Sequence, residues 1–353
     1  MRVVVIGAGG EMGARVCRAL AGVGGASVLG VSRSARGPVG VAMERGDVGD
    51  AASIARLLGA GDLVVNCVGP FHYDPGSLVR ACVAAGAHYC DLADDADFAE
   101  RVRTAAREAG ALLAGVCVCT SASTVPGLAG LFARELARAP RASEIASVAV
   151  YLSVGSANPV SAGLLASMLA PLGRQAAEGA PWFDELRALR TSSGRTLRFG
   201  SYPAAFAHGR VAVGAEPVPA RFFFGFDRAA LVALLHLASP LLALAPREAL
   251  LHFARALLPF ARALGVFGTP HGVLAVVAES ALGEEIARIE LSASARGLDI
   301  PAAPPAWIAA RLARGDSLPA GVRELSELVP FADVVRWVSA DAAYTLRARG
   351  LEL

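Results

Sequence analysis

The sequence contains no lysine, because all 33 of its basic residues are arginines. Arginine stays protonated at every accessible pH, so the chain has no side-chain amine that could form a Schiff base or act as a general base. A phosphate-binding loop that depends on lysine is excluded for the same reason. The bias towards arginine and alanine is typical of a GC-rich genome, and we expect a bacterial source.

The chain also lacks a large excess of charge of one sign. Its basic residues are scattered among 31 acidic ones, which leaves a formal net charge of +2. Nucleic acid requires concentrated positive charge, so we do not expect it as a partner. The first residues are strand-like, with no charged leader and long apolar segment, so we predict no signal peptide and a cytoplasmic location.

Cysteine and histidine are too few and too dispersed for a disulfide framework or a metal site. The cysteines lie mostly in apolar runs of the first third, where we expect buried, reduced thiols. They are Cys17, Cys67, Cys82, Cys90, Cys117 and Cys119. The later histidines show no ligand spacing, and we predict no metal. They are His208, His236, His252 and His271.

Residues 1–125 alternate short apolar runs with amphipathic stretches, which predicts parallel strands joined by helices. The expected strands are 2–6, 27–32, 63–68, 88–92 and 112–117. The expected helices are 11–21, 51–58, 76–85 and 98–109. We therefore predict an α/β chain that begins with a doubly wound parallel sheet of the Rossmann type.

The regular alternation ends near Pro126. Two later runs, 272–279 and 286–293, are separated by Gly-Glu-Glu and predict an antiparallel hairpin. Residues 126–324 are therefore expected to form a second, α+β domain for substrate binding or dimerisation. Helices are expected at 306–314 and 326–338.

A glycine-rich turn follows the first expected strand, with the sequence Gly7-Ala8-Gly9-Gly10-Glu11-Met12-Gly13. Glycines there permit a tight turn and let a helix N-terminus hold a pyrophosphate. The third glycine falls one position later than in GxGxxG, so an ordinary strand-to-helix turn stays an alternative. We predict that this turn binds a dinucleotide.

The end of the second strand favours NADP(H) over NAD(H). It carries Ser32 and Arg33, and no acid occurs between Glu11 and Glu44. A hydroxyl and a guanidinium suit a 2′-phosphate, with Arg36 as a second cation, although Arg33 as a solvated loop charge is the alternative. We assign Asp47 either to the adenine side of this site or to a helix cap.

Three ordered segments resemble the saccharopine dehydrogenase-like oxidoreductase family: 64–71 (VVNCVGPF), 78–82 (LVRAC) and 86–92 (GAHYCDL). The glycine turn read as GxxGxxG and the segment 123–127 (STVPG) are similar to this family as well. The resemblance implies that Val68, Gly69, Pro70 and Phe71 lie beside a nicotinamide. It also implies that C-terminal helices, within 325–353, pack back on the Rossmann domain.

Polar residues at the carboxyl ends of the expected strands are the candidates for chemistry. His72 and Tyr73 follow the Gly-Pro-Phe turn and can each supply a proton, so we predict them as catalytic residues. The alternatives are a surface histidine and a packed tyrosine. Ser121 and Asp91 are next in line, although Asp91 also suits a helix cap.

The segment 229–265 is strongly apolar, with Arg247, Arg255 and Arg262 as its polar stripe. Two prolines and a histidine within 229–246 argue against a membrane-spanning helix. Three interpretations remain: a core helix pair, which is favoured, the lining of an apolar pocket or homodimer interface, and a peripheral membrane contact.

Together these observations predict an NADP-dependent oxidoreductase that acts on a hydrophobic or lipid-like molecule bound between its two domains. The segment 89–92 resembles the broad branch of the family, with lipid-associated members and enoyl reductases, more than enzymes of lysine metabolism. One alternative is an opine-like oxidoreductase of a C–N bond, whose substrate carboxylates would contact the arginines at 187, 190, 195 and 198. Another is a catalytically silent NADP-binding sensor or scaffold.

Overall fold

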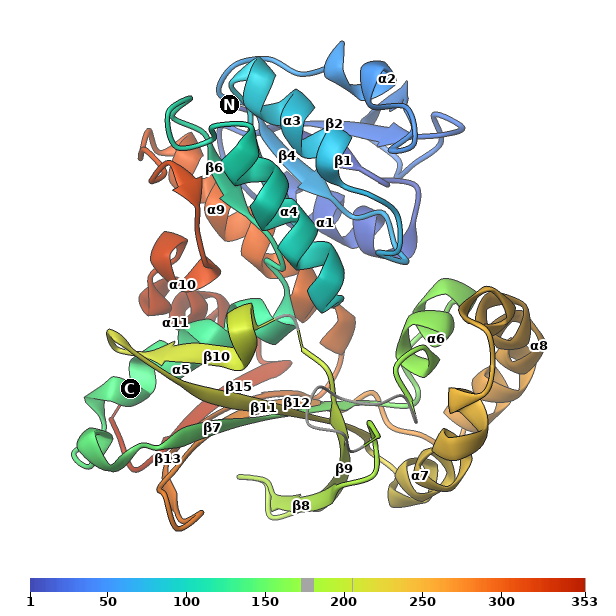
Figure 1. The fold of residues 1–353 in the computed structure, drawn as a ribbon, viewed down its shortest axis with the longest axis vertical. Coiled ribbons are helices and arrows are strands. Elements are labelled where there is room, and N and C mark those ends of the chain that lie inside the picture. The colour runs from blue at the N-terminus through green and yellow to red at the C-terminus, as the bar shows by residue number, and fades with distance from the viewer. Residues whose placement is uncertain (173–180, 205, 353) are drawn as a thin grey trace. The chain divides into compact units, whose positions relative to one another are not determined.

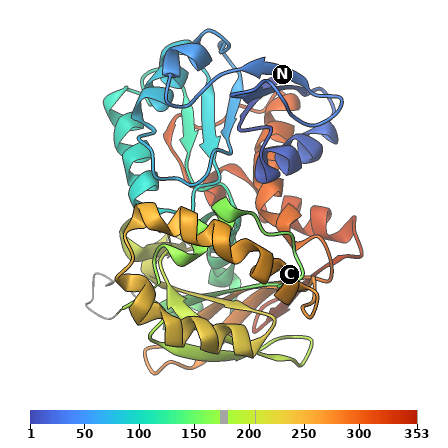
Figure 2. The ribbon, with the colours of Figure 1, turned by 90° about the vertical axis from the view of Figure 1, so that its right-hand side faces the viewer.

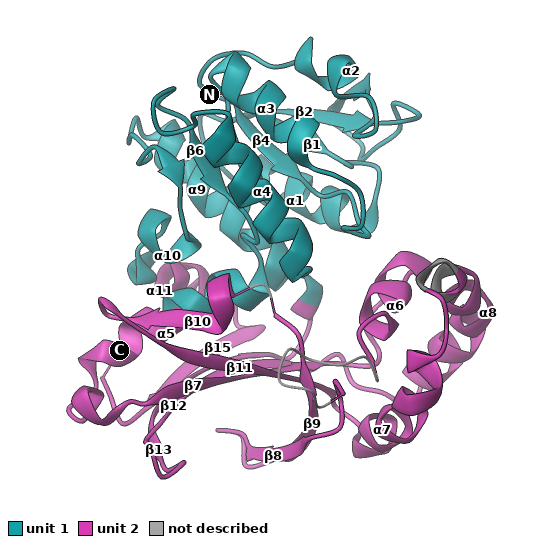
Figure 3. Ribbon diagram, in the orientation of Figure 1, with its two compact units in different colours: residues 1–131, 298–333 teal, residues 132–297, 334–353 magenta. Residues whose placement is uncertain are grey.

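A computed structural model describes residues 1–172, 181–204 and 206–352 of the chain. The chain divides into two compact units, which Figure 3 colours separately. Unit 1 comprises residues 1–131 and 298–333, and unit 2 comprises 132–297 and 334–353. The return to unit 1 thus begins at 298, before the expected 325, and the chain leaves unit 1 again after 333.

Unit 1 contains a parallel sheet of seven strands in the order β14-β6-β5-β4-β1-β2-β3 (Figure 1). The strands are β1 (Arg2–Ile6), β2 (Ser27–Ser32), β3 (Ala42–Arg45), β4 (Leu63–Asn66), β5 (His88–Asp91), β6 (Cys117–Cys119) and β14 (Gly321–Val322). The central strands are continuous apolar runs because helices cover both faces. The strand order reverses between β1 and β4, which is where a doubly wound sheet binds its ligand.

Helices cover both faces of this sheet (Figure 1). The helices α1 (Glu11–Ala21) and α9 (Ala303–Ala313) contact each other on one face. The other face carries α2 (Ala51–Ala55), α3 (Gly76–Ala85) and α4 (Ala96–Glu108). With α9 and α10 (Leu325–Leu328) in unit 1, the predicted Rossmann sheet with returning C-terminal helices is confirmed.

The strand expected at 112–117 corresponds to β6, which begins only at Cys117. Residues 110–115 form turns that expose the side chains of Leu112 and Leu113 by 64% and 94%. Apolar character alone suggested a strand there, because a short apolar run does not distinguish a buried strand from an exposed turn.

Unit 2 is built on a mixed sheet in the order β15-β13-β12-β7-β11-β9-β8, with β10 paired to β11. Its strands are β7 (Ser147–Val154), β8 (Leu186–Arg190), β9 (Thr196–Tyr202), β10 (Arg210–Val213), β11 (Glu216–Phe226), β12 (Gly272–Glu279), β13 (Glu285–Ala293) and β15 (Tyr344–Arg349). The expected hairpin is confirmed as β12 and β13. Tyr151, Phe199 and Phe223 pack together in its core.

The final residues correct the expectation that 325–353 returns to the Rossmann domain as helices. Strand β15 pairs with β13 of unit 2 along its whole length, from Tyr344 opposite Ala293 to Arg349 opposite Arg288. Its side chains alternate between more buried and exposed positions, as in a strand with one covered face. The return to unit 1 therefore ends within α11 (Phe331–Ser339).

The remaining helices are α5 (Ala129–Glu135), which crosses the division between the units, and α6 (Ala162–Leu169), α7 (Ala229–Ala243) and α8 (Arg247–Gly265) in unit 2. Helix α7 contacts β9 and β11, whereas α8 contacts α6. Figure 2 looks onto α7 and α8. Among the described residues, no helix has both the length and the apolar character needed to cross a membrane.

Candidate nucleotide-binding and reaction site

The glycine turn joins β1 to α1 at the carboxyl edge of the sheet. Gly7 adopts a positive φ of 84° and donates its amide to the carbonyl of Val31 at 2.8 Å. Gly10 is the N-cap of α1, and no side chain caps this helix end. Amides of the first helical turn, at Glu11 and Met12, are therefore available to an anionic ligand.

The three later glycines of the turn serve different steric purposes. A Cβ atom on Gly13 would lie 2.1 Å from the Gly7 carbonyl oxygen, so the turn closes only with glycine there. A Cβ on Gly9 would lie 2.5 Å from the carbonyl oxygen of Arg36, so glycine at this position leaves room for the loop that follows β2. A Cβ on Gly10 would meet only the Gly7 oxygen, at 3.3 Å. Gly10 is therefore the glycine that keeps the helix end open to a ligand.

Glu11 places a negative charge at the helix end that is expected to hold a pyrophosphate. Its Oε1 accepts hydrogen bonds from Arg15, at 3.0 Å from Nε and 2.7 Å from Nη2. The guanidinium of Arg15 also forms an ion pair with Asp299, so one positive charge is shared by two carboxylates. Arg15 thus offsets only part of the acidic charge that would repel a phosphate at this helix end.

The predicted 2′-phosphate residues lie together at the end of β2. The Ser32 hydroxyl accepts the Arg36 amide at 3.1 Å and donates to the Arg36 carbonyl at 2.9 Å, so it orders this turn. Arg33 and Arg36 are exposed, and neither forms an ion pair with a residue that the structure describes. Their binding of a phosphate stays a prediction.

Asp47 follows β3 and is exposed. Its Oδ1 accepts the amide of Gly49 at 3.0 Å, while the N-cap of α2 is Asp50, which accepts the amide of Ser53. The helix-capping alternative for Asp47 is therefore wrong, because Asp50 occupies that position. Its proximity to an adenine stays a prediction.

The Gly-Pro-Phe turn follows β4, and its Gly69–Pro70 peptide bond is cis. Phe71 is buried edge-to-face against Phe98 of α4, with ring centroids 5.0 Å apart, and Tyr73 packs against the same ring at 5.3 Å. A Cβ on Gly69 would meet no atom within 4 Å. Phe98, which the sequence did not single out, thus anchors a turn whose Gly69 backbone faces open space.

Asn66, at the end of β4, is fully buried and organises the polar groups behind this turn. Its Nδ2 donates to the hydroxyls of Tyr73 at 2.8 Å and Tyr89 at 3.1 Å, and its Oδ1 accepts the Val68 amide at 3.2 Å. Burial raises the pKa of the Tyr73 hydroxyl well above its ordinary value. The hydroxyl therefore stays protonated near neutral pH, and Asn66 fixes its position.

A buried carboxylate, Asp91, ends the neighbouring strand β5. Its Oδ1 accepts the amides of Ser121 at 2.7 Å and Ala93 at 3.0 Å and the hydroxyl of Thr120 at 3.0 Å. Its Oδ2 has no hydrogen-bond partner among the described residues. Burial raises the pKa of Asp91, and the hydrogen bonds to Oδ1 oppose that rise.

Ser121 is the second unusual residue beside this carboxylate. It adopts a positive φ of 59°, which is rare for a residue other than glycine, and its buried Oγ has no partner among the described residues. Strained backbone and unsatisfied buried polar atoms gather at functional sites because surrounding contacts must maintain them. Asp91 and Ser121 thus extend the candidate site from β4 to the ends of β5 and β6.

The two predicted proton donors differ in their surroundings. His72 is exposed, and its backbone amide donates to the Pro70 carbonyl at 2.8 Å. Tyr73 is half-buried and held by Asn66. Both lie on the turn after β4 at the expected edge of the sheet, and their catalytic roles stay predictions.

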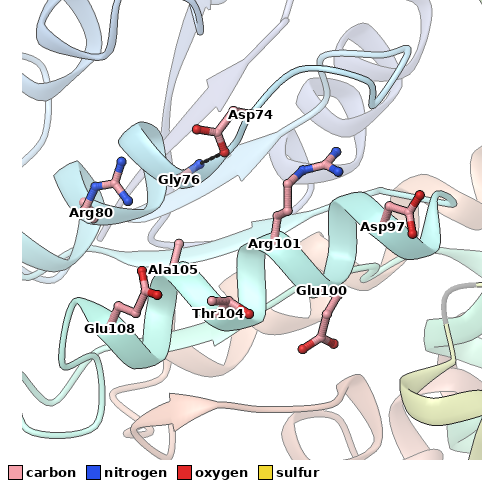
Figure 4. Close-up of a pocket in the computed structure, with 9 residues that line it drawn as sticks. All are labelled: Asp74, Gly76, Arg80, Asp97, Glu100, Arg101, Thr104, Ala105 and Glu108. Carbon is pink, nitrogen blue, oxygen red and sulfur yellow. Dashed lines mark hydrogen bonds between the residues drawn. The ribbon is translucent and has the colours of Figure 1, made fainter.

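A separate surface depression of about 440 Å³ lies between α3 and α4 (Figure 4). Charged side chains dominate its lining, including Arg80, Arg101, Glu100 and Glu108. It contains no residue of the glycine turn or of the Asn66 cluster. A ligand of the predicted apolar class does not suit it.

One known family and one curated relative match part of this chain. Residues 3–118 match the family described as the saccharopine dehydrogenase NADP-binding domain. A probable mitochondrial saccharopine dehydrogenase-like oxidoreductase of Arabidopsis thaliana is 34% identical over 84 residues, which are 23% of this chain and 18% of that relative. The match therefore spans less than a fifth of the relative's length.

Two solved structures share the fold over almost the whole chain. Saccharopine dehydrogenase (L-Glu forming) of Saccharomyces cerevisiae covers 99% of both chains at 14% identity, with a TM-score of 0.58. Homospermidine synthase of Legionella pneumophila, solved in complex with NAD, covers 99% of this chain and 91% of its own at 12% identity, with a TM-score of 0.63. These matches confirm the resemblance: residues 3–118 are similar to the NADP-binding domain of saccharopine dehydrogenases, and the chain shares the fold of the two solved structures.

Proposed function

We propose that this protein is an NADP-dependent oxidoreductase that transfers a hydride to or from a hydrophobic small molecule. The polar cluster of buried Asn66, buried Asp91 and half-buried Tyr73 carries the proposal, because it lies beside the Gly-Pro-Phe turn at the carboxyl edge of a domain that resembles known NADP-binding domains. Burying such groups is unfavourable unless they are paired, and Asp91 keeps one oxygen unpaired. Nucleotide binding alone does not require that arrangement.

The preference for NADP(H) over NAD(H) rests on charge at the end of β2. Arg33 and Arg36 lie there without a carboxylate partner among the described residues. An acid that would accept the ribose 2′-hydroxyl of NAD is absent from the sequence between Glu11 and Glu44. A 2′-phosphate would be attracted by both arginines.

When bound, the nicotinamide supplies or accepts a hydride, which carries two electrons. For a reduction, the atom next to the carbon that receives the hydride must also take a proton. We assign this proton to the Tyr73 hydroxyl, because Asn66 donates to its oxygen at 2.8 Å and would stabilise the phenolate that the transfer leaves, which opposes the rise in pKa that burial causes. Solvent can return a proton to Tyr73 after each turnover, because its side chain is only half-buried.

An apolar substrate is favoured over a polycarboxylate because one candidate arginine of unit 2 is paired within the protein and the other three lie on an exposed hairpin. Arg187 forms ion pairs with Glu185 at 2.9 Å and Glu279 at 3.0 Å, and its guanidinium lies 4.6 Å from the centroid of the Phe223 ring. The arginines at 190, 195 and 198 are exposed on the β8–β9 hairpin. Their arrangement is that of a solvated face.

Variants of the two candidate donors test the proposed reaction. NADPH oxidation is followed with lipophilic enones, aldehydes and ketones, alongside imines of amino acids, starting from whatever ligand mass spectrometry finds in the purified protein. We expect Tyr73→Phe to lower kcat by about 10²–10⁴ while the Kd for NADPH stays nearly unchanged. His72→Ala is measured in parallel, with His271→Ala, another exposed histidine, as the control.

Loss of activity in His72→Ala but not in Tyr73→Phe would transfer the donor role to His72. An unchanged kcat in both variants would exclude His72 and Tyr73 as the proton donor. Tight NADPH binding without turnover of any compound would instead support the silent sensor or scaffold.

A further inference from the structure

Exposed hydrophobic side chains gather on α7 and α8 of unit 2. Of the fourteen large hydrophobic side chains that the described residues expose, eight lie between 234 and 267. Contiguous exposed apolar surface is unfavourable in water and marks a surface that something else covers. The favoured expectation that these helices form a core pair is therefore wrong, because much of their apolar surface is uncovered.

On α7 the exposed leucines form one stripe. Leu234, Leu237, Leu241 and Leu244 follow one another at spacings of three and four residues and are exposed by 53%, 75%, 73% and 81%. Such spacing places side chains on one side of a helix. Another side of α7 contacts β9 and β11. The leucine stripe thus points away from the sheet.

On α8 the phenylalanines continue this pattern. Phe253 and Phe260 lie seven residues apart and are exposed by 45% and 57%, and Phe267, in the turn that follows α8, is exposed by 75%. Ala254, on another side of the helix, is fully buried, and α8 contacts α6. Figures 1 and 2 agree in placing α7 and α8 at the same end of unit 2. We call these leucines and phenylalanines the α7–α8 face.

The charge around this face is positive. Residues 229–265, which span both helices, contain three arginines and one acid, which gives 3 − 1 = +2 with histidines neutral. Arg255 and Arg262 are exposed on α8, and neither forms an ion pair with a residue that the structure describes. Each of these arginines follows a phenylalanine by two residues and so lies on the polar side of α8, and a helix with one apolar side and a basic polar side suits an anionic lipid surface.

We propose that the α7–α8 face rests on an anionic lipid surface. The leucines and phenylalanines would enter the boundary of the acyl chains, and Arg255 and Arg262 would lie at the level of the lipid phosphates. No described helix is long and apolar enough to cross the bilayer, so the helices lie along its surface. The inference is independent of the proposed chemistry, because its residues belong to unit 2 and its test measures binding.

Cosedimentation of the full chain with vesicles tests this proposal. We expect binding to vesicles of phosphatidylcholine with about one third phosphatidylglycerol, and weaker binding to pure phosphatidylcholine or at about 1 M salt. The double variant Leu237→Ser and Leu241→Ser should bind at least about tenfold more weakly, because it removes two leucines that would leave water. Leu282→Ser is the control, since Leu282 is 87% exposed but lies in the β12–β13 turn.

Charge is tested separately with the double variant Arg255→Gln and Arg262→Gln. We expect its binding to anionic vesicles to fall about thirtyfold, and its binding to neutral vesicles to stay the same. Coincident melting curves and NADPH affinities establish that the variants fold as the wild type does. If the leucine variant does not fold, the arginine variant decides alone.

The proposal is overturned if the wild type does not sediment with anionic vesicles, or if both double variants bind as the wild type does. Sedimentation velocity without lipid distinguishes the other occupant of the face. A wild-type dimer that the leucine variant converts to a monomer, with no vesicle binding by the wild type, would assign the face to a second copy. Failure here leaves NADPH binding and turnover unaffected, so the two proposals fail separately.

Discussion

Alanine substitutions at Gly10 and Gly13 should separate cofactor binding from folding within one turn. Gly10 is the N-cap of α1, and Gly13 lies three residues later in the first turn of the helix. At Gly13 an added Cβ would lie 2.1 Å from the Gly7 oxygen and 2.8 Å from the Ala8 Cα. These are backbone atoms, so the turn itself must shift.

The expected magnitudes differ accordingly. Overpacking of this kind typically costs about 1–3 kcal/mol, and we expect Gly13→Ala to lose at least that much stability. At Gly10 the backbone is extended, with φ of −86° and ψ of 168°, which alanine adopts freely. Alanine is a poorer N-cap than glycine, so Gly10→Ala should lose only about 0.5 kcal/mol. Its methyl group would stand where a pyrophosphate approaches the helix end, and NADPH should bind at least about tenfold more weakly.

Urea unfolding of each variant and calorimetric titration with NADPH provide the two readouts. The expected pattern is a stable Gly10→Ala protein with weak binding and a destabilised Gly13→Ala protein. Undiminished NADPH affinity in a folded Gly10→Ala protein would refute the assignment of this helix end to the pyrophosphate. Equal stability of the two variants would refute the steric argument.

Two further predictions concern stability. The His88 Nδ1 accepts a hydrogen bond from the Cys117 amide at 3.0 Å, and burial lowers the pKa of His88. The unfolded state therefore binds the proton more strongly than the folded state, so the free energy of unfolding should fall as the pH falls below about 6.5. The fall should be smaller in His88→Gln. Urea midpoints between about pH 7 and pH 5 measure this, and parallel curves would contradict it. The Ser192 hydroxyl donates to the buried Glu290 at 2.5 Å, so Ser192→Ala should lose about 1–2 kcal/mol. An unchanged melting temperature would contradict this, and would mean that the hydrogen bonds from the Ser192 amide are enough to stabilise the Glu290 carboxylate.

Periodicity predicted the elements of unit 1 well because parallel strands covered on both faces are continuous apolar runs. Strand β1 and helix α3 have the predicted bounds, and the hairpin of β12 and β13 is close to them. Strands β8 to β11 were not predicted, because their arginines and glycines obscure the alternation of strand residues. The residues of β15 were expected to belong to the returning C-terminal helices. The sequence did not reveal this strand, since its pairing with β13 depends on residues about fifty positions away.

The candidate site was predicted in its turns but not in its interior. The glycine turn, Arg33 and Tyr73 follow directly from motifs in the sequence. The contact of Tyr73 with Phe98 and the hydrogen bond between Asn66 and Tyr89 join separate elements of the fold. Local sequence patterns therefore could not predict them. The close approach of the Arg36 carbonyl to Gly9 is likewise a contact between separate elements, which the sequence does not reveal.

The central claim, an NADP-binding site at the end of β2, is tested most directly by titrating the wild type and Arg33→Asp with NADPH and NADH. We predict that the wild type binds NADPH at least about tenfold more tightly, a difference of about 1.4 kcal/mol, and that Arg33→Asp reverses the order. Arg18→Asp, an exposed arginine in the last turn of α1, is the control and should keep the preference. Equal affinities of the wild type for the two nucleotides, or the same preference in Arg33→Asp, would contradict the claim.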